Sequence, residues 1–401
     1  MSTNRSEAAT GCSSKAIIEW LFGEGRRIEG TRRFVHALAH QMNAHGASID
    51  RLMVSLLTLN PQLVATSETW LKSTDTTTTI NASHDVRTSE RYIGSPLEAI
   101  YKTHKRVRQR LDNLPEDAHR AYTELAEDGF TDYLALPVLF GETDEPGAAI
   151  IICTKREGGF TVQDVASFRQ VRDYVAPVLE VHALRYLSRS LMNTYVGKRT
   201  SEKVLAGMVK RGDADIINAA LWFSDLRDFT HITETLPAKQ VLEMLNEYFE
   251  FVAAAVGAQG GEILRFIGDA MLIVFPIGEN MCIQNACQSA IDAAIDAHNT
   301  LEVLNHQRRR NQLPEIEFGV GLNVGEVIYG NVGAPDRLDF TVMGPAVNRT
   351  ARLESLTKEL GRSILFSKEF AKLIDQPVHF FGDFAMKGIA EPQPVYGLES
   401  D

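Results

Sequence analysis

Apolar residues recur along this chain with two different periods, which predict alternating helices and strands. One early segment has apolar residues every three or four positions, as on one face of a helix: Phe34, Val35, Leu38 and Met42. Residues 52–59 are apolar except for Ser55 and Thr58, a composition that is typical of a strand. Two further predicted strands, 133–140 and 147–153, flank an acidic segment whose composition favours a hairpin. We therefore expect a mixed α and β domain over residues 28–185.

From residue 213 onward, strand-like runs alternate with longer amphipathic helices. Strands are predicted at 219–224, 316–323, 326–332 and 338–343, with a tight hairpin at 262–275. Helices are predicted at 237–256, 283–306 and 345–359. The inward face of the first helix is expected to carry Leu242, Leu245, Phe249 and Val252. Strands covered by helices in this order indicate an α+β sheet of ferredoxin-like type over residues 213–401.

The segments outside these two domains are predicted to be a tail and a connector. Residues 1–27 begin with small and polar side chains, so we expect a mobile N-terminal tail. Apolar residues at helical spacing from Phe168 to Leu191 predict a long helix that leaves the first domain. Such a helix either covers its own domain or presents a dimerising seam to a second copy. Residues 186–212 are then a helical connector.

Composition and charge narrow the functional class. The 401 residues include 41 basic and 52 acidic side chains, and the formal net charge of −11 argues against a general nucleic-acid-binding protein. The four cysteines have no paired metal-binding spacing and suit a reducing compartment. No uncharged apolar run approaches the roughly 20 residues that cross a bilayer. We therefore expect a cytoplasmic protein without a membrane span.

Two aspartates at the ends of apolar strands carry the most informative chemistry. Asp225 ends the first strand of the second domain, and Asp269 follows Gly268 at the tip of the predicted hairpin. Each alone has an ordinary explanation, because Asp caps helices and Gly-Asp suits a tight turn. Together the two aspartates are stronger evidence for a metal site, since antiparallel pairing of the two strands would bring both carboxylates to shared Mg²⁺ or Mn²⁺ ions. The turn after Asp225 would also expose backbone amides to phosphate groups.

A second polar pair follows the last predicted strand. Asn348 and Arg352 are four positions apart, so they lie on one face of the helix that starts near Pro345. A neutral hydrogen-bonding side chain beside a permanent cation suits a charged phosphoryl transition state. For these two residues alone, a polar helix start with a solvated arginine is the commoner explanation. Lys387 is a further candidate for binding the phosphate groups of a nucleoside triphosphate, although a lysine in the chain is more commonly an ordinary surface residue.

In order and spacing, three segments resemble the catalytic domain of class III nucleotidyl cyclases: Phe223 to Thr230, Arg265 to Phe275, and Phe340 to Leu353. The resemblance implies a head-to-tail homodimer that converts ATP to 3′,5′-cyclic AMP and pyrophosphate. Asp225 and Asp269 of one chain would hold two Mg²⁺ or Mn²⁺ ions, with the Leu226 carbonyl as a further ligand. The Phe229 and Thr230 amides would contact phosphates, and Asn348 and Arg352 would come from the other chain.

The same resemblance assigns base recognition to Arg265 and Thr341. One subgroup of adenylate cyclases uses lysine and threonine at these positions, so Thr341 fits and Arg265 departs. Arginine donates only; it can address N1 of adenine but cannot accept the N1–H of guanine. It can nevertheless donate to guanine O6 and N7, so we favour ATP and keep GTP as the alternative. Asp228 and Pro345 also depart from the family pattern, at positions where glycine and an acidic residue are usual.

The first domain resembles a GAF domain in its pattern. The similarity rests on Gly129-Phe130, two apolar strands around an acidic turn, Gly159-Phe160-Thr161 and a long helix. It implies a regulatory domain for an unknown small molecule or protein. His36 and His40 lie one helical turn apart and could hold a metal or a haem, but two polar positions on a helix face are the more frequent explanation.

Two other functional classes are weighed against the cyclase. A dimeric scaffold that binds nucleotide without turning it over would explain Arg265 and Asp228, but it would not need both aspartates and the Asn348–Arg352 pair. A diguanylate cyclase is set aside, because its Gly-Gly-[Asp/Glu]-Glu-Phe loop is absent and the hairpin reads Phe266-Ile-Gly-Asp-Ala270. The sequence thus predicts an adenylate cyclase that is regulated by its N-terminal domain.

Overall fold

The computed structural model describes residues 12–399 apart from 59, 61, 142–143 and 279–280. The chain divides into two compact units, Met1–Leu191 and Met192–Asp401. Both combine helices with an extensive sheet, so the α+β class predicted from the sequence is confirmed. Among the described residues, no helix has the length and apolar character that a bilayer crossing would require.

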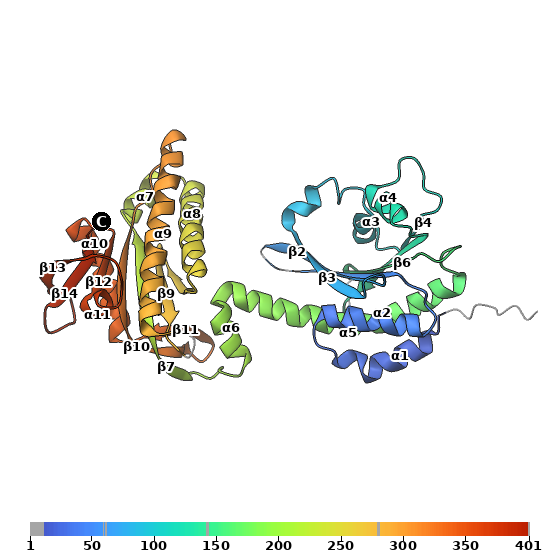
Figure 1. Ribbon diagram of the computed structural model, residues 1–401, viewed down its shortest axis with the longest axis horizontal. Helices are drawn as coiled ribbons and strands as arrows, with labels where there is room; N and C mark the ends of the chain where they lie inside the picture. Colours follow the sequence, from blue (N-terminus) through green and yellow to red (C-terminus); the bar gives the residue numbers. More distant parts are fainter. Residues whose placement is uncertain (1–11, 59, 61, 142–143, 279–280, 400–401) are drawn as a thin grey trace, which may run out of the picture. The chain divides into compact units, whose positions relative to one another are not determined.

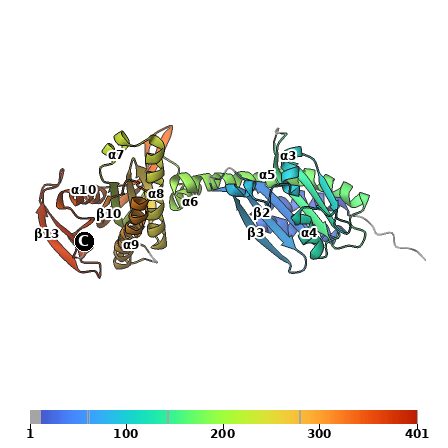
Figure 2. The same ribbon diagram turned by 90° about the horizontal axis from the view of Figure 1, so that it is seen from above.

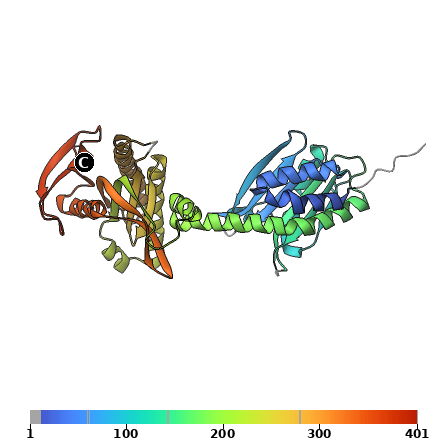
Figure 3. The same ribbon diagram turned by 90° about the horizontal axis from the view of Figure 1, so that it is seen from below.

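The first unit is built on a six-stranded antiparallel sheet in the order β3-β2-β1-β6-β5-β4. Its strands are β1 (Arg51–Leu57), β2 (Leu63–Leu71), β3 (Thr76–Ser83), β4 (Val107–Arg110), β5 (Asp132–Leu139) and β6 (Pro146–Thr154). Three helices cover one face: α1 (Ser14–Gly23), α2 (Thr31–Ala44) and α5 (Val162–Val196) (Figures 1 and 3). The other face is covered by α3 (Pro96–Thr103) and α4 (Arg120–Glu127) (Figure 2). The assignment of this unit to the GAF family stays a prediction.

The expected mobile tail is wrong for the part of it that the structure describes. Helix α1 occupies Ser14–Gly23, and the short 3-10 helix η1 follows at Gly25–Arg27. Ile17 and Leu21 are fully buried in the main core of the unit. They are one helical turn apart, so they dock the helix although Glu19 between them is exposed. Residues 1–11 lie outside the described residues.

The second unit is an eight-stranded sheet in the order β13-β14-β12-β10-β7-β9-β8, with β11 paired to β10. Its strands are β7 (Ala214–Leu226), β8 (Glu262–Ile267), β9 (Ala270–Pro276), β10 (Phe318–Ala334), β11 (Arg337–Met343), β12 (Ile364–Ser367), β13 (Val378–Phe384) and β14 (Gln393–Leu398). Its helices are α6 (Lys198–Leu205), α7 (Phe229–Thr235), α8 (Ala238–Ala258), α9 (Ile283–Arg310), α10 (Pro345–Leu360) and α11 (Lys368–Ala371). The largest core lies between the sheet and the pair α8 and α9, whereas α10 packs on the opposite face (Figure 1).

Three local expectations for this unit are corrected. The strands predicted at 316–323 and 326–332 are one continuous strand, β10, in which Gly325 lets α10 approach closely instead of making a break. Leu242 is 58% exposed, because the buried face of α8 is one position earlier and carries Val241 and Met244. That helix is apolar on more than one face, so spacing alone did not fix its orientation.

Arg308 is the third correction. Three consecutive arginines, 308–310, end α9, and such a run near a helix C-terminus is expected from the sequence to be solvated. Only 5% of Arg308 is exposed. Its Nε donates to the Pro314 carbonyl at 2.6 Å, and the guanidinium pairs with Glu247 of α8. A buried arginine is tolerated here because both of these acceptors satisfy it.

Candidate active site

Strand register brings Asp225 and Asp269 together. Strands β7 and β9 are antiparallel with Ser224 opposite Met271, so Asp225 lies beside the start of β9. Asp269 immediately precedes β9 in the turn after β8, where Gly268 has a φ of +67° that suits glycine. Both aspartates line one cleft. The sequence predicted this proximity from two strand ends, and the structure has it.

Burial and the nearby Asp269 carboxylate both disfavour ionisation of Asp225. Burial raises the pKa of Asp225 from 3.8 to about 7, and the neighbouring charge of Asp269 and a hydrogen bond with it act in the same direction. The Oδ1 atom of Asp225 is buried and has no hydrogen-bond partner among the described residues. A buried acceptor without a donor, beside a second carboxylate, fits a divalent cation with oxygen ligands.

Glu354 of α10 is a third carboxylate at this cleft, and the sequence reasoning missed it. Burial raises its pKa to about 8, with further contributions from the charges of Asp225 and Asp269, while Arg227 opposes the shift. Gly319 of β10 is paired with Asp225, and a Cβ placed on Gly319 would lie 3.0 Å from Glu354 Oε1. Glu354 shares a face of α10 with Thr350, four positions earlier, but the burial of Thr350 is known only from the structure, so spacing alone gave no signal for Glu354.

The predicted phosphate-binding turn forms the rim of the same cleft. Phe229 and Thr230 begin α7, and both line the cleft together with the buried Leu226. Asp228 precedes them with a φ of +56°, a left-handed conformation in which glycine is favoured. Its carboxylate pairs with Lys358 of α10. Lys358 therefore counters the negative charge that Asp228 adds beside the expected triphosphate.

The predicted base-recognition residues lie on two other strands. Arg265 is on β8 and is half exposed, whereas Thr341 on β11 is buried. The Arg265 guanidinium forms an ion pair with Asp339, which precedes Thr341 by two residues on β11. Because alternate residues of a strand share a face, Asp339 and Thr341 point to the same side. Asp339 is a second residue that the sequence reasoning missed.

The remaining predicted residues lie apart from the paired aspartates within one chain. Asn348 and Arg352 are on α10, and Lys387 is exposed in the segment between β13 and β14. The described lining of the cleft includes Glu354, Ser355, Thr357 and Lys358 from α10, but not these three residues. One chain thus brings the two aspartates and the first residues of α7 to one cleft, whereas Lys387 and the predicted transition-state pair lie outside its described lining.

Comparison with known proteins identifies the second unit. Residues 214–399 match the family model of the adenylate and guanylate cyclase catalytic domain. This unit is a class III nucleotidyl cyclase domain. The match contains both aspartates of the cleft and begins at the first residue of β7.

Two curated relatives illustrate the similarity of the cyclase domain to named enzymes. The chain is 35% identical to adenylate cyclase 1 of Rhizobium meliloti over 178 residues, which are 43% of this chain and 26% of that protein. It is 32% identical to the adenylate cyclase of Anabaena cylindrica over 176 residues, which are 43% of this chain and 34% of that protein. The chain therefore spans about a quarter to a third of the length of these relatives.

Solved structures with similar chains include cyclases of both base specificities. The adenylyl cyclase CyaB from P. aeruginosa is 29% identical and covers 46% of this chain and 95% of its own, with a TM-score of 0.42. The guanylyl cyclase Cya2 is 30% identical and covers 46% of this chain and 93% of its own, with a TM-score of 0.41. The family of the cyclase domain rests on the family model.

Proposed function

We propose that this chain is an adenylate cyclase that forms 3′,5′-cyclic AMP and pyrophosphate from ATP. The observation that carries the proposal is the paired carboxylates of Asp225 and Asp269 in one cleft of the cyclase domain, with Asp225 Oδ1 left without a partner among the described residues. In the reaction the 3′-oxygen of the ribose bonds to the α-phosphorus and loses its proton to solvent. The bond from the α-phosphorus to the oxygen that bridges it to the β-phosphorus breaks, and pyrophosphate leaves with that oxygen.

The cleft residues fit a pair of Mg²⁺ or Mn²⁺ ions and a triphosphate. Asp225 and Asp269 would hold the ions, with the Leu226 carbonyl as an additional oxygen ligand. Such ions, when bound, neutralise phosphate charge and lower the pKa of the 3′-hydroxyl. Phe229 and Thr230 line the cleft at the first turn of α7, where a phosphate oxygen can accept from their amides. Lys387 does not line this cleft in its own chain, so its positive charge would reach the triphosphate only from a second copy of the chain.

A second copy of the chain would complete each site. Asn348 and Arg352 do not line the described cleft of their own chain, so they are available to the cleft of a partner. Two exposed apolar residues support an association surface on the cyclase domain. Ile216 of β7 is 69% exposed and is paired in register with Ile328 of β10, which is 44% exposed. Arg352 of the second copy would then steady the charge on the pentacovalent phosphorus.

GTP is the second candidate substrate, and the Arg265–Asp339 ion pair is the observation that favours it. A carboxylate can accept the N1–H of guanine, which the Arg265 guanidinium cannot do. The same carboxylate can accept from the 6-amino group of adenine. Asp339 therefore supplies the acceptor for guanine N1–H that Arg265 lacks, and GTP becomes a possible substrate. ATP also fits a site formed by Arg265, Asp339 and Thr341.

A product assay tests the proposal. The purified full chain is incubated with ATP or GTP and Mg²⁺ or Mn²⁺, and cyclic products are separated by chromatography. We expect cyclic AMP, and a loss of at least about 100-fold in Asp225→Ala and in Asp269→Ala. The control is Asp215→Ala, at the other end of β7, where Asp215 pairs with Lys203. Full activity in either cleft variant would overturn the metal assignment, and tight ATP binding without any product would support the scaffold.

We also propose that the first unit regulates the cyclase domain in response to an unknown small molecule or protein. The support is its separate core and sheet, which leave the cyclase domain a compact unit of its own. A shortened chain that begins near residue 200 is compared with the full chain in the same assay, after both are checked for cooperative unfolding. Equal kcat and KM for the two folded proteins would contradict this regulatory role.

A further inference from the structure

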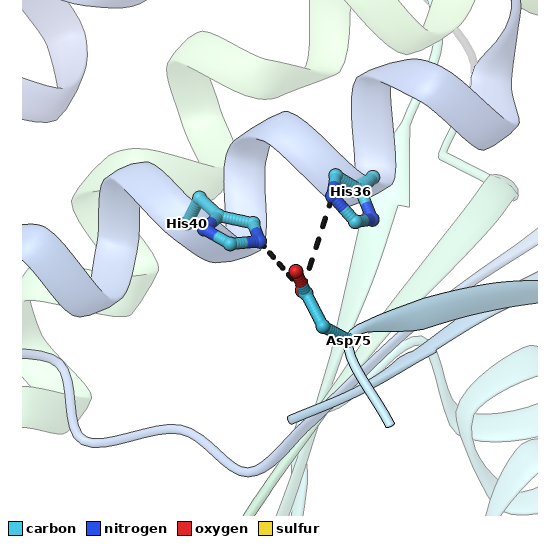
Figure 4. A group of neighbouring side chains, drawn as sticks. All are labelled: His36, His40 and Asp75. Atoms are coloured by element: carbon cyan, nitrogen blue, oxygen red, sulfur yellow. Dashed lines mark hydrogen bonds and ion pairs between the residues drawn. The ribbon is translucent and has the colours of Figure 1, made fainter. Parts of the chain in front are cut away.

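Three side chains of the first unit converge on a small region of its surface. His36 and His40 lie one turn apart on α2, and Asp75 lies in the turn between β2 and β3 (Figure 4). His40 Nε2 is 2.7 Å from Asp75 Oδ1, and His36 Nε2 is 3.9 Å from the same oxygen. The possible ligand atoms of the three residues all lie within 4.8 Å of one another.

Neighbouring polar groups orient two of these side chains. The indole N–H of the buried Trp70 donates to Asp75 Oδ1 at 3.0 Å. Thr77 Oγ1 lies 3.4 Å from His36 Nδ1, which can donate to it and leave Nε2 free of a proton. Histidines that bind metals commonly donate their second N–H in this way, and the donation fixes the tautomer.

We propose that His36, His40 and Asp75 bind one divalent late first-row transition-metal ion, with Zn²⁺ as the reference case. Ligand bonds to Zn²⁺ from imidazole nitrogen and carboxylate oxygen are about 2.0–2.2 Å long. Ligand atoms that share one tetrahedral ion are then roughly 3–3.5 Å apart, a separation that lies between the two distances observed here. Small side-chain rotations would therefore bring the three ligand atoms to the separations that one tetrahedral ion requires. The ion would replace the proton that now links His40 to Asp75.

The composition and exposure of the group define the ion that it would accept. Two imidazoles favour Zn²⁺, Co²⁺ or Ni²⁺ over Mg²⁺, which prefers oxygen ligands. The side chains of His36, His40 and Asp75 are 39%, 51% and 57% exposed, so water can fill the remaining positions. The bound ion would also join helix α2 to the β2–β3 turn. This site goes beyond the proposed cyclase activity and does not depend on it.

Zinc binding to the full chain tests the proposal. Zn²⁺ is titrated by calorimetry with excess Mg²⁺ present, and the titration is repeated in Asp225→Asn so that the cleft of the cyclase domain does not compete. We expect one Zn²⁺ per chain, with affinity reduced at least about tenfold in His40→Ala, His36→Ala and Asp75→Asn. Trp70→Phe, which removes the indole donor, should weaken binding about tenfold. His306→Ala, an exposed histidine on α9, is the matched control and should bind like the wild type.

A thermal melt separates loss of the site from loss of the fold. Zn²⁺ should raise the unfolding temperature of the wild type and of His306→Ala, but not that of His40→Ala, whose metal-free melt should match the wild type. Failure of the wild-type chain to bind Zn²⁺ would overturn the proposal. Equal binding by the wild type and Asp75→Asn would overturn it as well, and would reduce the cluster to a hydrogen-bonded His–Asp contact. Neither outcome bears on cyclic-nucleotide production.

Discussion

At the scale of single residues, the cyclase domain concentrates negative charge in a partly buried cleft. Asp225, Asp269 and Glu354 all line it, and the pKa values of Asp225 and Glu354 are raised to about 7 and about 8. Burial is the largest cause for both groups, and the like charges add to it. In the absence of cations, such an arrangement opposes ionisation. Residues placed in this way serve ligand binding at the expense of stability.

The first prediction is that Asp225→Asn stabilises the metal-free protein. The folded-state pKa of Asp225 is raised from 3.8 to about 7, so the folded protein binds more protons than the unfolded chain between these values. The contribution of the protonated Asp225 carboxyl group to the free energy of unfolding is therefore complete below about pH 4 and is lost as the pH rises to about 7. We expect Asp225→Asn to gain about 1 kcal/mol at pH 8 in chelator, after a discount for solvent screening, or about 3 °C in Tm.

The measurement is a set of thermal melts from about pH 4 to about pH 8, a range that spans the raised pKa. The gain should shrink toward the acid end, where the wild-type carboxyl is already protonated. Asp215→Asn, on the same strand but outside the cleft, is the control and should show no such trend. A pH-independent difference for Asp225→Asn would mean that the charge is not the source of the effect.

The second prediction concerns base selection by Arg265. Lysine is a compact point charge that keeps a donor for N1 of adenine, whereas the rigid planar fork of arginine is better matched to two adjacent acceptors such as O6 and N7 of guanine. We expect Arg265→Lys to raise the ratio of kcat/KM for ATP over GTP by about tenfold, which corresponds to ~1.4 kcal/mol. Steady-state kinetics with both nucleotides measure the ratio. Arg337→Lys, an exposed position at the start of β11, is the control, and an unchanged ratio in Arg265→Lys would contradict base recognition there.

At the scale of elements, two glycines of β10 set the height of α10 above the sheet. A Cβ on Gly321 would lie 2.3 Å from the Thr350 carbonyl oxygen and 2.5 Å from the Glu354 nitrogen, and one on Gly319 would lie 2.2 Å from Thr357 Oγ1. Backbone atoms of the helix cannot yield at such distances without moving the helix. Helix α10 carries Asn348 and Arg352 as well as Glu354, so its position affects every one of these groups.

The third prediction is that Gly321→Ala displaces α10. We expect a loss of about 1–3 kcal/mol in the free energy of unfolding, as for an overpacked core, and a fall in cyclase activity of at least about tenfold. Denaturant unfolding and the product assay give the two values. Gly257→Ala in α8 is the control, because no described atom lies within 4 Å of the place that its Cβ would take and alanine is the better helix former. The Gly257→Ala control should leave activity unchanged. If Gly321→Ala changed neither the free energy of unfolding nor the activity, the predicted displacement of α10 would be wrong.

At the scale of the whole molecule, the predicted catalytic residues are divided between two sets. Asp225 and Asp269 line a cleft of the described chain, whereas Asn348 and Arg352 lie on α10 outside its lining. A head-to-tail pair of chains would form two complete sites, each with the aspartates of one chain and Asn348 and Arg352 of the other. An activity that depends on such a pair would rise more steeply than linearly with protein concentration near the dissociation constant of the dimer.

The fourth prediction is that two inactive variants restore each other. A mixture of Asp225→Ala and Arg352→Ala chains contains heterodimers in which one of the two sites keeps every wild-type group. We expect each variant alone to be nearly inactive and the mixture to recover up to about a quarter of the wild-type activity, because about half of the dimers are mixed and each has one intact site. Differently tagged chains verify the heterodimers. Verified heterodimers without activity would count against a shared site.

Local chemistry in the sequence was enough to predict much of the cyclase domain. Pro345 marked the start of α10, and Gly268-Asp269 marked the hairpin tip, because proline at a first helical position and glycine with positive φ have local causes. Leu242 and Arg308 were misjudged because the orientation of a helix depends on what packs against it. Glu354 and Asp339 were missed because each acquires its role from a partner distant in sequence.

The sequence by itself determined the α+β class, the family of the second unit and the proximity of Asp225 and Asp269. Periodicity, turn chemistry and ordered motifs depend on residues that are close together in the chain, so they can be recognised without the structure. Only the tertiary structure decided that Glu354 joins those aspartates, that Asp339 pairs with Arg265, and that Asp75 meets His36 and His40. Strand register and the close approach of a helix to a sheet bring such groups together, and neither is encoded by the spacing of the residues that meet.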